Sequence, residues 1–365
     1  MLLKNGHTDS VNALSLSDRL LISAGEDGSV CLWSPDESCV PVSKLNNPRS
    51  CMAVKFHPKH QNNFYTSHGE TIYSWDVRHL NIPQREWNVN EDEVNSLDVL
   101  ADEPTLAAAD DSGQVKIIDT VTGDVIRTLD KHRSICSAAK FRPERNCQLI
   151  SGDMSGRLFV TDWKDSGRRL FIFELPELVA PSLEDHESSE GSDSDELDRP
   201  GVEGCDRAAD VRNNHDPSST DSSDASSAST FNQSSGSPIL REWTSSFPVN
   251  PPMVHGISCT PSGDLVAAGL ASCSVALFQG AGRRLKFVKS LAGHSMSVSV
   301  VHFLNNSTLL SGGNDTNLFL WDMDSNFASR RIPHRSKLNA IEGREVKQVF
   351  LADCSPEIHV VDLST

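Results

Sequence analysis

The sequence lacks a long hydrophobic run, and it therefore predicts no membrane-spanning helix. Its most apolar stretch, residues 170–180, is short and carries Glu174 and Glu177, whereas a spanning helix needs about 20 apolar residues. The N-terminal segment MLLKNGHTDS has no apolar core of the length that a signal peptide requires. We therefore expect a protein of the cytoplasm, the nucleus or both, with no membrane partner.

Positive charge is also scarce. Lysine and arginine number 33 against 50 aspartate and glutamate residues, which gives a formal net charge of −17. A surface of this sign repels the phosphates of nucleic acids and attracts basic proteins. We expect no direct nucleic-acid partner.

Paired cysteine motifs and catalytic motifs are missing as well. The nine cysteines include no CxxC pair, so they fit reduced thiols better than a disulfide framework or a zinc site. The sequence contains no P-loop, HExxH or GxSxG motif. The paired acids Asp110 and Asp111 fall in a predicted turn, where aspartate is favoured by hydrogen bonds to its own backbone. We predict no enzyme, no metal and no cofactor.

What the sequence does contain is one short phrase repeated seven times. Its clearest copies are GEDGSVCLWS (residues 25–34) and GNDTNLFLWD (residues 313–322). The last residues of the seven copies are Ser34, Asp76, Asp119, Asp162, Gln279, Asp322 and Asp362. The steps between them are 42, 43, 43, 117, 43 and 40 residues. Five of the six steps match the period of a four-stranded propeller blade, roughly 40–45 residues.

The local pattern supports the same architecture. Each repeat consists of short apolar runs bounded by Gly, Asn and Asp, which indicates strands rather than helices. The last copy ends three residues before the end of the sequence, so its blade has no room for a fourth strand. Residues 1–3 can supply that strand and close the ring. We predict an all-β, seven-bladed propeller that is closed by its N-terminal strand.

The step of 117 residues marks an insertion between blades 4 and 5. Residues 181–240 hold 15 Ser, 14 Asp plus Glu, 3 Arg and one aromatic residue, which is too little apolar surface for a core. We expect residues 1–175 to form blades 1–4, residues 176–248 a disordered acidic insertion, and residues 249–365 blades 5–7 of the same domain. An acid stands three residues after each of Ser182, Ser192 and Ser218. These serines are candidate phosphorylation sites, and a solvated spacer is the alternative interpretation.

The repeats resemble the WD40-repeat β-propellers. The matching residues are Gly6-His7 with Leu32-Trp33, Trp75-Asp76, and Gly293-His294 with Trp321-Asp322. The resemblance covers residues 1–175 and about 249–365. Four stretches, residues 67–80, 88–97, 108–119 and 132–143, resemble one member of the family more closely, and the long insertion departs from it.

Two blades carry matching sets of polar residues. These sets are His7, Ser23, Asp27 and Trp33 in blade 1, and His294, Ser311, Asp315 and Trp321 in blade 6. Histidine, serine and aspartate together would suit a hydrolase, but an enzyme needs one such site and not two. The resemblance implies a buried hydrogen-bond chain in which Asp accepts from His, Ser bridges, and the Trp indole completes the chain. The other blades keep only fragments, such as His132 and Ser151 in blade 4.

One motif points to a partner. The sequence Trp75-Asp76-Val77-Arg78 resembles the box of substrate receptors of cullin-RING ubiquitin ligases, which dock on the damage-specific DNA-binding protein adaptor. The box has an acid where this chain has Gly69, with Glu70 one place away. A second, poorer copy ends at Lys164. An arginine at the end of a third strand is also typical of a solvated or structural residue at the rim.

The sequence therefore predicts a monomeric, non-catalytic scaffold that binds proteins. The first hypothesis is a substrate receptor of a cullin-RING ligase, with Arg78 and to a lesser extent Lys164 docking the adaptor and the opposite face holding an unnamed substrate. The alternative is an acidic scaffold for basic proteins such as histones or ribosomal proteins, which the net charge and the acidic insertion favour.

Overall fold

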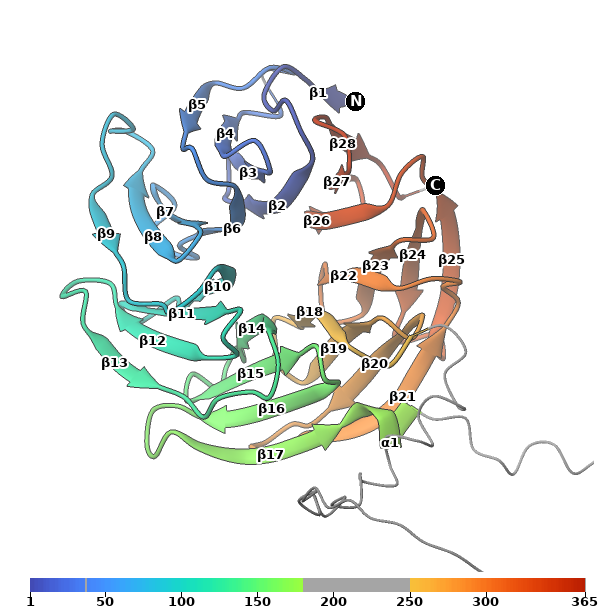
Figure 1. The fold of residues 1–365 in the computed structure, drawn as a ribbon. Helices are drawn as coiled ribbons and strands as arrows, with labels where there is room; N and C mark the ends of the chain where they lie inside the picture. The colour runs from blue at the N-terminus through green and yellow to red at the C-terminus, as the bar shows by residue number, and fades with distance from the viewer. Residues whose placement is uncertain (37, 180–249, 365) are drawn as a thin grey trace, which may run out of the picture. The chain divides into compact units, whose positions relative to one another are not determined.

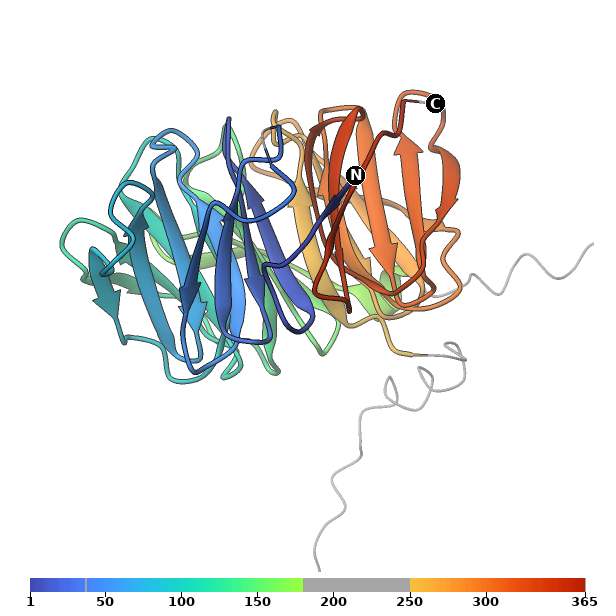
Figure 2. The same ribbon diagram turned by 90° about the horizontal axis from the view of Figure 1, so that it is seen from above.

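The computed structural model describes residues 1–36, 38–179 and 250–364, and these form a ring of seven four-stranded antiparallel sheets (Figure 1). The predicted seven-bladed propeller is confirmed. Seen from the side, the strands cross the ring from one face to the other (Figure 2). None of the helical residues in the described part of the chain forms a segment long and apolar enough to cross a membrane.

The first four blades follow one another along the chain. Blade 1 holds β2 (Val11–Leu16), β3 (Leu21–Gly25), β4 (Ser29–Trp33) and β5 (Ser43–Asn46). Blade 2 holds β6 (Cys51–Phe56), β7 (Asn63–His68), β8 (Thr71–Asp76) and β9 (Arg85–Trp87). Blade 3 holds β10 (Val94–Val99), β11 (Thr105–Asp110), β12 (Val115–Asp119) and β13 (Val125–Thr128). Blade 4 holds β14 (Cys136–Phe141), β15 (Gln148–Asp153), β16 (Arg157–Asp162) and β17 (Arg168–Glu174).

The last three blades repeat this order after the insertion. Blade 5 holds β18 (Val254–Cys259), β19 (Leu265–Leu270), β20 (Ser274–Gln279) and β21 (Lys286–Ala292). Blade 6 holds β22 (Val298–Phe303), β23 (Thr308–Gly313), β24 (Asn317–Asp322) and β25 (Ala328–Pro333). Blade 7 holds β26 (Leu338–Glu345), β27 (Gln348–Asp353), β28 (Ile358–Val361) and β1 (Leu2–Leu3).

Burial follows from the position of a strand within its blade. Every residue of the second strands β3, β11 and β15 is buried, because both faces of the middle of a blade are covered by the neighbouring blades. The fourth strands lie on the outer edge, and β5 and β25 alternate between half-buried and exposed residues. Small and apolar residues therefore make up most of these middle strands, whereas β5 shows the period of two of a strand with one exposed face.

The ring is closed by the N-terminal strand, as predicted. Strand β1 pairs antiparallel with β28, with Leu2 opposite His359 and Leu3 opposite Ile358. The Val360 amide also donates to the Met1 carbonyl at 2.9 Å. The Leu3 side chain is fully buried in a cluster that joins blades 7 and 1.

The insertion separates blades 4 and 5, as predicted. Before it, the chain forms a short helix, α1 (Leu175–Val179), whose Leu175, Leu178 and Val179 pack on the core shared by β17 and blade 5. The packed chain thus runs past residue 175, the predicted boundary, because these apolar side chains cover that core. The candidate phosphorylation sites Ser182, Ser192 and Ser218 lie outside the described residues.

Removing residues 1–5 should destabilise the protein, because it deletes β1, uncovers β28 and leaves the place of Leu3 empty. The free energy of unfolding should fall by at least ~2 kcal/mol from the lost apolar burial alone. Chemical denaturation of the truncated and full-length chains measures this. The matched control is Lys4→Ala, which alters the same segment at an exposed side chain and should change stability little. Equal stability of the truncated and full-length chains would contradict closure by β1.

Candidate functional site

The four polar residues of blade 1 form one hydrogen-bond chain. The indole N–H of Trp33 donates to Ser23 Oγ at 2.8 Å, and Ser23 Oγ lies 2.6 Å from Nε2 of His7. The other ring nitrogen of His7 faces Asp27 Oδ1 at 3.3 Å. A carboxylate only accepts, so Nδ1 carries the proton and Ser23 donates to Nε2. Burial lowers the pKa of His7, which keeps the ring neutral at pH 7.

Blade 6 repeats this geometry. Trp321 donates to Ser311 Oγ at 2.8 Å, Ser311 lies 2.8 Å from Nε2 of His294, and Nδ1 of His294 lies 3.0 Å from Asp315 Oδ2. The connectivity is that of a Ser-His-Asp triad. However, the Ser23 and Ser311 side chains are fully buried, and each Oγ already accepts from an indole. These serines cannot contact a substrate, so both sets stabilise the structure of their blades.

Blades 3, 4 and 7 carry a second version of the set, of which the sequence analysis recognised only His132 and Ser151 in blade 4. Here the carboxylate is the last residue of the second strand and a serine stands two residues later; the pairs are Asp110 with Ser112, Asp153 with Ser155, and Asp353 with Ser355. Asn90, His132 and His334 bind these carboxylates at 2.9, 3.0 and 2.8 Å. In blade 4, His132 also lies 2.7 Å from Ser151 Oγ. The repeated Asp-x-Ser spacing was the available signal.

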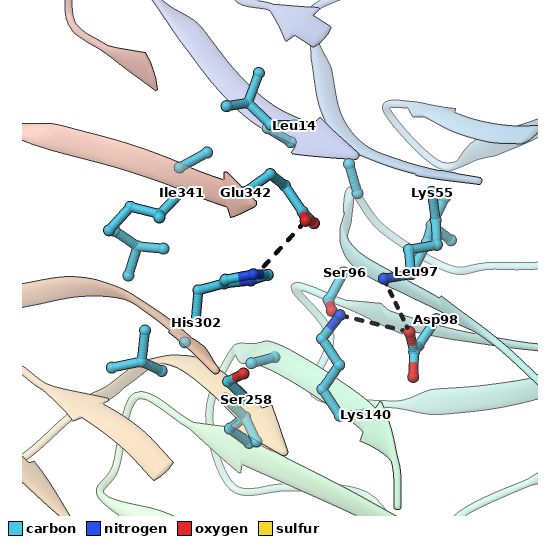
Figure 3. A pocket seen from close by; sticks show the side chains of 18 of the residues that line it. Leu14, Lys55, Ser96, Leu97, Asp98, Lys140, Ser258, His302, Ile341 and Glu342 are labelled. Carbon is cyan, nitrogen blue, oxygen red and sulfur yellow. Dashed lines mark hydrogen bonds and ion pairs between the residues drawn. The ribbon is translucent and has the colours of Figure 1, made fainter. Parts of the chain in front are cut away.

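The central channel is lined by the first strands of all seven blades. The fifth residues of these strands are Ser15, Lys55, Asp98, Lys140, Ser258, His302 and Glu342. All of them except Ser15 line one cavity of about 410 Å³ (Figure 3). The second residues of the same strands line it too; they are Asn12, Met52, Asn95, Ser137, His255, Ser299 and Asn339. The sequence analysis did not recognise this polar cluster.

The charges in the channel compensate one another. Asp98 Oδ1 lies 3.7 Å from the Lys55 ammonium and 3.4 Å from that of Lys140, and His302 lies 3.9 Å from Glu342 (Figure 3). The positive charge of Lys140 and burial lower the pKa of Lys55. Burial acts to lower the pKa of Lys140 too, but the carboxylates of Asp98 and Glu342 outweigh it and raise that pKa. Both lysines are thus held by acids within the channel.

Three of the fifth residues connect one blade to the next by hydrogen bonds. Ser15 Oγ, Asp98 Oδ2 and Ser258 Oγ accept hydrogen bonds from the backbone amides of Phe56, Phe141 and Phe303 in the following blades, at 3.0, 2.9 and 2.9 Å. These fifth residues therefore hold the inner strands in register. The channel combines a structural role with a polar interior, and its charges are satisfied from within.

The proposed docking residue Arg78 lies at the rim, in the turn that follows β8. Its Nε–H donates to Asp76 Oδ1 at 2.9 Å and its Nη2–H donates to Oδ2 at 2.5 Å. The Arg78 side chain is 63% exposed, whereas the Asp76 side chain is 3% exposed. The hydrogen bond from Arg78 lowers the pKa of Asp76 to about 2. Trp75 is anchored next to them, because its indole donates to Thr66 Oγ1 at 3.0 Å.

Lys164 occupies the same kind of turn in blade 4. Its ammonium lies 2.5 Å from Glu103 of blade 3, and 47% of its side chain is exposed. Third strands run from the hairpin with the second strand toward this turn, so Arg78 and Lys164 share one face of the ring. Each of them is paired with an acid, Arg78 with Asp76 and Lys164 with Glu103.

The opposite face has an acidic channel mouth, which we define by Glu26, Glu93 and Asp111. Asn12 and Asn95 donate to Glu26 and Asp111 at 2.9 and 2.5 Å. Burial and the nearby charges of Asp111 and Glu26 raise the pKa of Glu93. Glu26 and Asp111 line a depression of about 540 Å³. Apolar and thiol side chains line the same depression; these are Met52, Ile135, Met154 and Cys354.

Comparison with known proteins agrees with this geometry. The family model described as WD40, "WD domain, G-beta repeat", matches residues 2–34 and 285–322. Each segment runs from the fourth strand of one blade to the third strand of the next, and the two contain both complete His-Ser-Asp-Trp sets. The "WD repeat-containing protein 53 homolog" of Dictyostelium discoideum is 22% identical over 401 residues, which covers 98% of this chain and 93% of that protein.

Replacing Asp315 by alanine should destabilise blade 6, because His294 would lose its acceptor. Burial alone would raise the pKa of Asp315, but bonds from the Ser295 amide and His294 hold it below its ordinary value, so the carboxylate is ionised at pH 7. The expected loss is about 1–3 kcal/mol in the free energy of unfolding, measured by denaturant titration. Asp324→Ala, at an exposed position in the same blade, is the control and should lie near wild type. If Asp315→Ala lowers the free energy of unfolding no more than the control does, the hydrogen-bond set does not stabilise the blade.

Proposed function

We propose that this seven-bladed β-propeller, two segments of which match the WD40 repeat, is a scaffold for protein interactions and acts as a substrate receptor of a cullin-RING ubiquitin ligase. The observation that carries the proposal is the Trp75–Arg78 segment. It presents a held but largely exposed guanidinium at the rim of one face. In this proposal the segment docks on the damage-specific DNA-binding protein adaptor.

The geometry of Arg78 suits a docking contact. Asp76 fixes the guanidinium through two hydrogen bonds, so little side-chain entropy remains to be lost when a partner binds. The remaining N–H donors of the planar group are available for a carboxylate or carbonyl of the partner. Lys164 on the same face is a minor second contact, because Glu103 already neutralises its charge.

The opposite face would then hold the substrate. The depression at the acidic channel mouth combines Met52, Ile135 and Met154 with polar and acidic side chains. Apolar side chains surrounded by a polar rim are typical of protein interfaces. The face that docks the ligase and the face that holds the substrate are thereby separated by the height of the ring.

Arg78→Ala should weaken capture of the adaptor by the full-length chain, by roughly tenfold or more if the arginine is a central contact. Co-precipitation with purified adaptor and titration by surface plasmon resonance measure this. Arg283→Ala is a matched control, because Arg283 lies in the corresponding turn of blade 5 and its side chain is 66% exposed. Arg78→Lys keeps the charge but loses the bidentate fork, and we expect it to bind in between.

Two outcomes would contradict the proposal in different ways. Capture of the adaptor by Arg78→Ala at wild-type strength would remove Arg78 from the interface. If the wild-type chain unfolds cooperatively but captures no adaptor, the proposed ligase function is wrong.

A second candidate function is an acidic scaffold for basic proteins such as histones or ribosomal proteins. The acidic channel mouth favours it, because three carboxylates from blades 1 and 3 meet where apolar side chains are also accessible. Burial and repulsion from Asp111 and Glu26 raise the pKa of Glu93, and a lysine or arginine side chain entering this mouth would relieve the repulsion.

Removing the charge of the mouth tests this second function. The variant Glu26→Gln/Glu93→Gln/Asp111→Asn removes the charges and keeps the side-chain shapes. It should weaken binding of core histones several-fold. Binding is measured at about 0.15 M salt, because long-range attraction between exposed charges is then largely screened. Deletion of residues 181–240 is the companion variant, and fluorescence anisotropy measures both. If only the deletion weakens binding, the acidic residues that bind histones lie in the insertion. Loss with neither variant would contradict the acidic-scaffold function.

A further inference from the structure

Blade 7 contains a cluster of two histidines and one aspartate, in which His359 is added to the His334–Asp353 pair. His334 precedes β26, Asp353 ends β27 and His359 lies in β28. His334 Nε2 lies 2.8 Å from Asp353 Oδ2, and His359 Nε2 lies 3.8 Å from the same oxygen. The three ligand atoms all lie within 4.8 Å of one another. Asp353 is fully buried, and the two imidazoles are 9% and 19% exposed.

Comparison with blades 4 and 6 shows what is different here. In those blades a serine of the second strand lies opposite a phenylalanine of the third; the pairs are Ser151 with Phe159 and Ser311 with Phe319. The serine binds the histidine of the set and the phenylalanine packs on its ring. In blade 7 the corresponding pair is Leu351 with His359. The hydroxyl is therefore lost and the aromatic ring is replaced by a second imidazole.

These two replacements change the chemistry of the cluster. With no serine opposite it, His334 turns and faces Asp353 with Nε2, whereas His132 and His294 face their aspartates with Nδ1. His359 Nε2 is buried and has no hydrogen-bond partner among the described residues. A buried ring nitrogen without a partner is costly, and it points toward an anionic oxygen and a second imidazole.

We propose that His334, Asp353 and His359 bind a divalent transition-metal ion, with Zn²⁺ as the best match. Imidazole nitrogens and a carboxylate oxygen are the ligands that Zn²⁺ prefers, at about 2.0–2.2 Å, and three protein ligands with one water complete a tetrahedron. A metal would give the lone pair of His359 Nε2 the partner that it lacks. It would replace the hydrogen bond from His334 to Asp353, with His334 in the tautomer protonated at Nδ1.

The neighbouring charges decide how tightly the ion would bind. Arg335 Nε lies 3.8 Å from Asp353 Oδ2 and opposes a cation there. The Arg335 side chain is 50% exposed, and its Nη2 lies 2.9 Å from Glu357, which retains the arginine when a metal occupies the carboxylate. Lys4 lies 3.7 Å from the other carboxylate oxygen of Glu357. Arg335 therefore weakens the site without blocking it.

The position of the site couples it to closure of the ring. His359 lies opposite Leu2 in the pair of strands that joins the two ends of the chain. A metal bound by His334, Asp353 and His359 would tie β28 to β27 and to the loop before β26. Binding to the folded ring alone would raise its stability with the logarithm of the metal concentration once that concentration exceeds the Kd.

The test uses the full-length chain after treatment with a chelator. Titration with Zn²⁺ by calorimetry, and with Co²⁺ followed by the visible absorption of the tetrahedral ion, should each show a saturable site with one equivalent of metal. His359→Phe places at this position the residue that blades 4 and 6 use, and it should lower affinity at least about tenfold, since even an outer-shell partner contributes 10- to 100-fold. At the same metal concentration, the thermal midpoint should rise more for wild type than for the variant.

Three further variants keep the result unambiguous. Cys354→Ser removes a neighbouring exposed thiol, and it should leave binding unchanged. Arg335→Gln removes the opposing charge, and it should tighten binding several-fold. His359→Gln replaces the phenylalanine variant if that one is unstable. No saturable binding by wild type, equal affinity in wild type and the His359 variants, or loss of binding with Cys354→Ser would each overturn the proposal.

Discussion

The pairing of β1 with β28 is the constraint on which the rest of this ring depends. At each of the six other junctions the chain passes from one blade to the next, whereas blades 7 and 1 are linked through β1, which completes the sheet of blade 7. Two residues of strand suffice because Leu3 is fully buried between the blades. Side chains add to the seam, since Asn339 donates to the Val11 carbonyl at 3.1 Å and Gln348 donates to Asp36 at 3.1 Å. Closure then covers the middle strands of every blade on both faces.

Within the closed ring, a carboxylate stabilises the hairpin between the second and third strands in blades 1, 3, 4, 6 and 7. Asp27 and Asp315 stand in the turn, whereas Asp110, Asp153 and Asp353 stand two positions earlier with a serine in the turn instead. Both arrangements put a carboxylate next to the polar side chain that leads into the blade, at 2.8–3.3 Å. A buried carboxylate needs several donors, and either arrangement supplies them. The position of the carboxylate in space therefore defines this interaction, and its position in the repeat can vary.

This explains how far the sequence could predict the structure. The blade count, the closing strand and the place of the insertion follow from one marker residue per repeat, because it recurs at the period of a propeller blade within runs that have the pattern of strands. The carboxylates of the sets in blades 3, 4 and 7 were missed, since a fixed template expects the aspartate two positions later. The channel residues were missed for another reason. Lys55, Asp98 and Glu342 each look like a solvent-facing residue of their own strand, and only the ring brings them together. Helix α1 extended the packed chain because Leu175 and its neighbours meet a core contributed by a later blade.

The fixed position of Arg78 determines what a docking contact there would cost. A free arginine on a surface loses side-chain entropy when it binds, and an exposed ion pair contributes little. Arg78 has already lost that freedom to Asp76, a carboxylate with only 3% of its side chain exposed. The pair presents N–H donors outward while its own charge is largely balanced, so a partner gains directed hydrogen bonds rather than long-range attraction. Such a contact selects for orientation and depends weakly on salt. Contact at the acidic channel mouth, where the carboxylates repel one another, would instead weaken steeply with added salt. The salt dependence of binding therefore distinguishes which face of the ring a partner occupies.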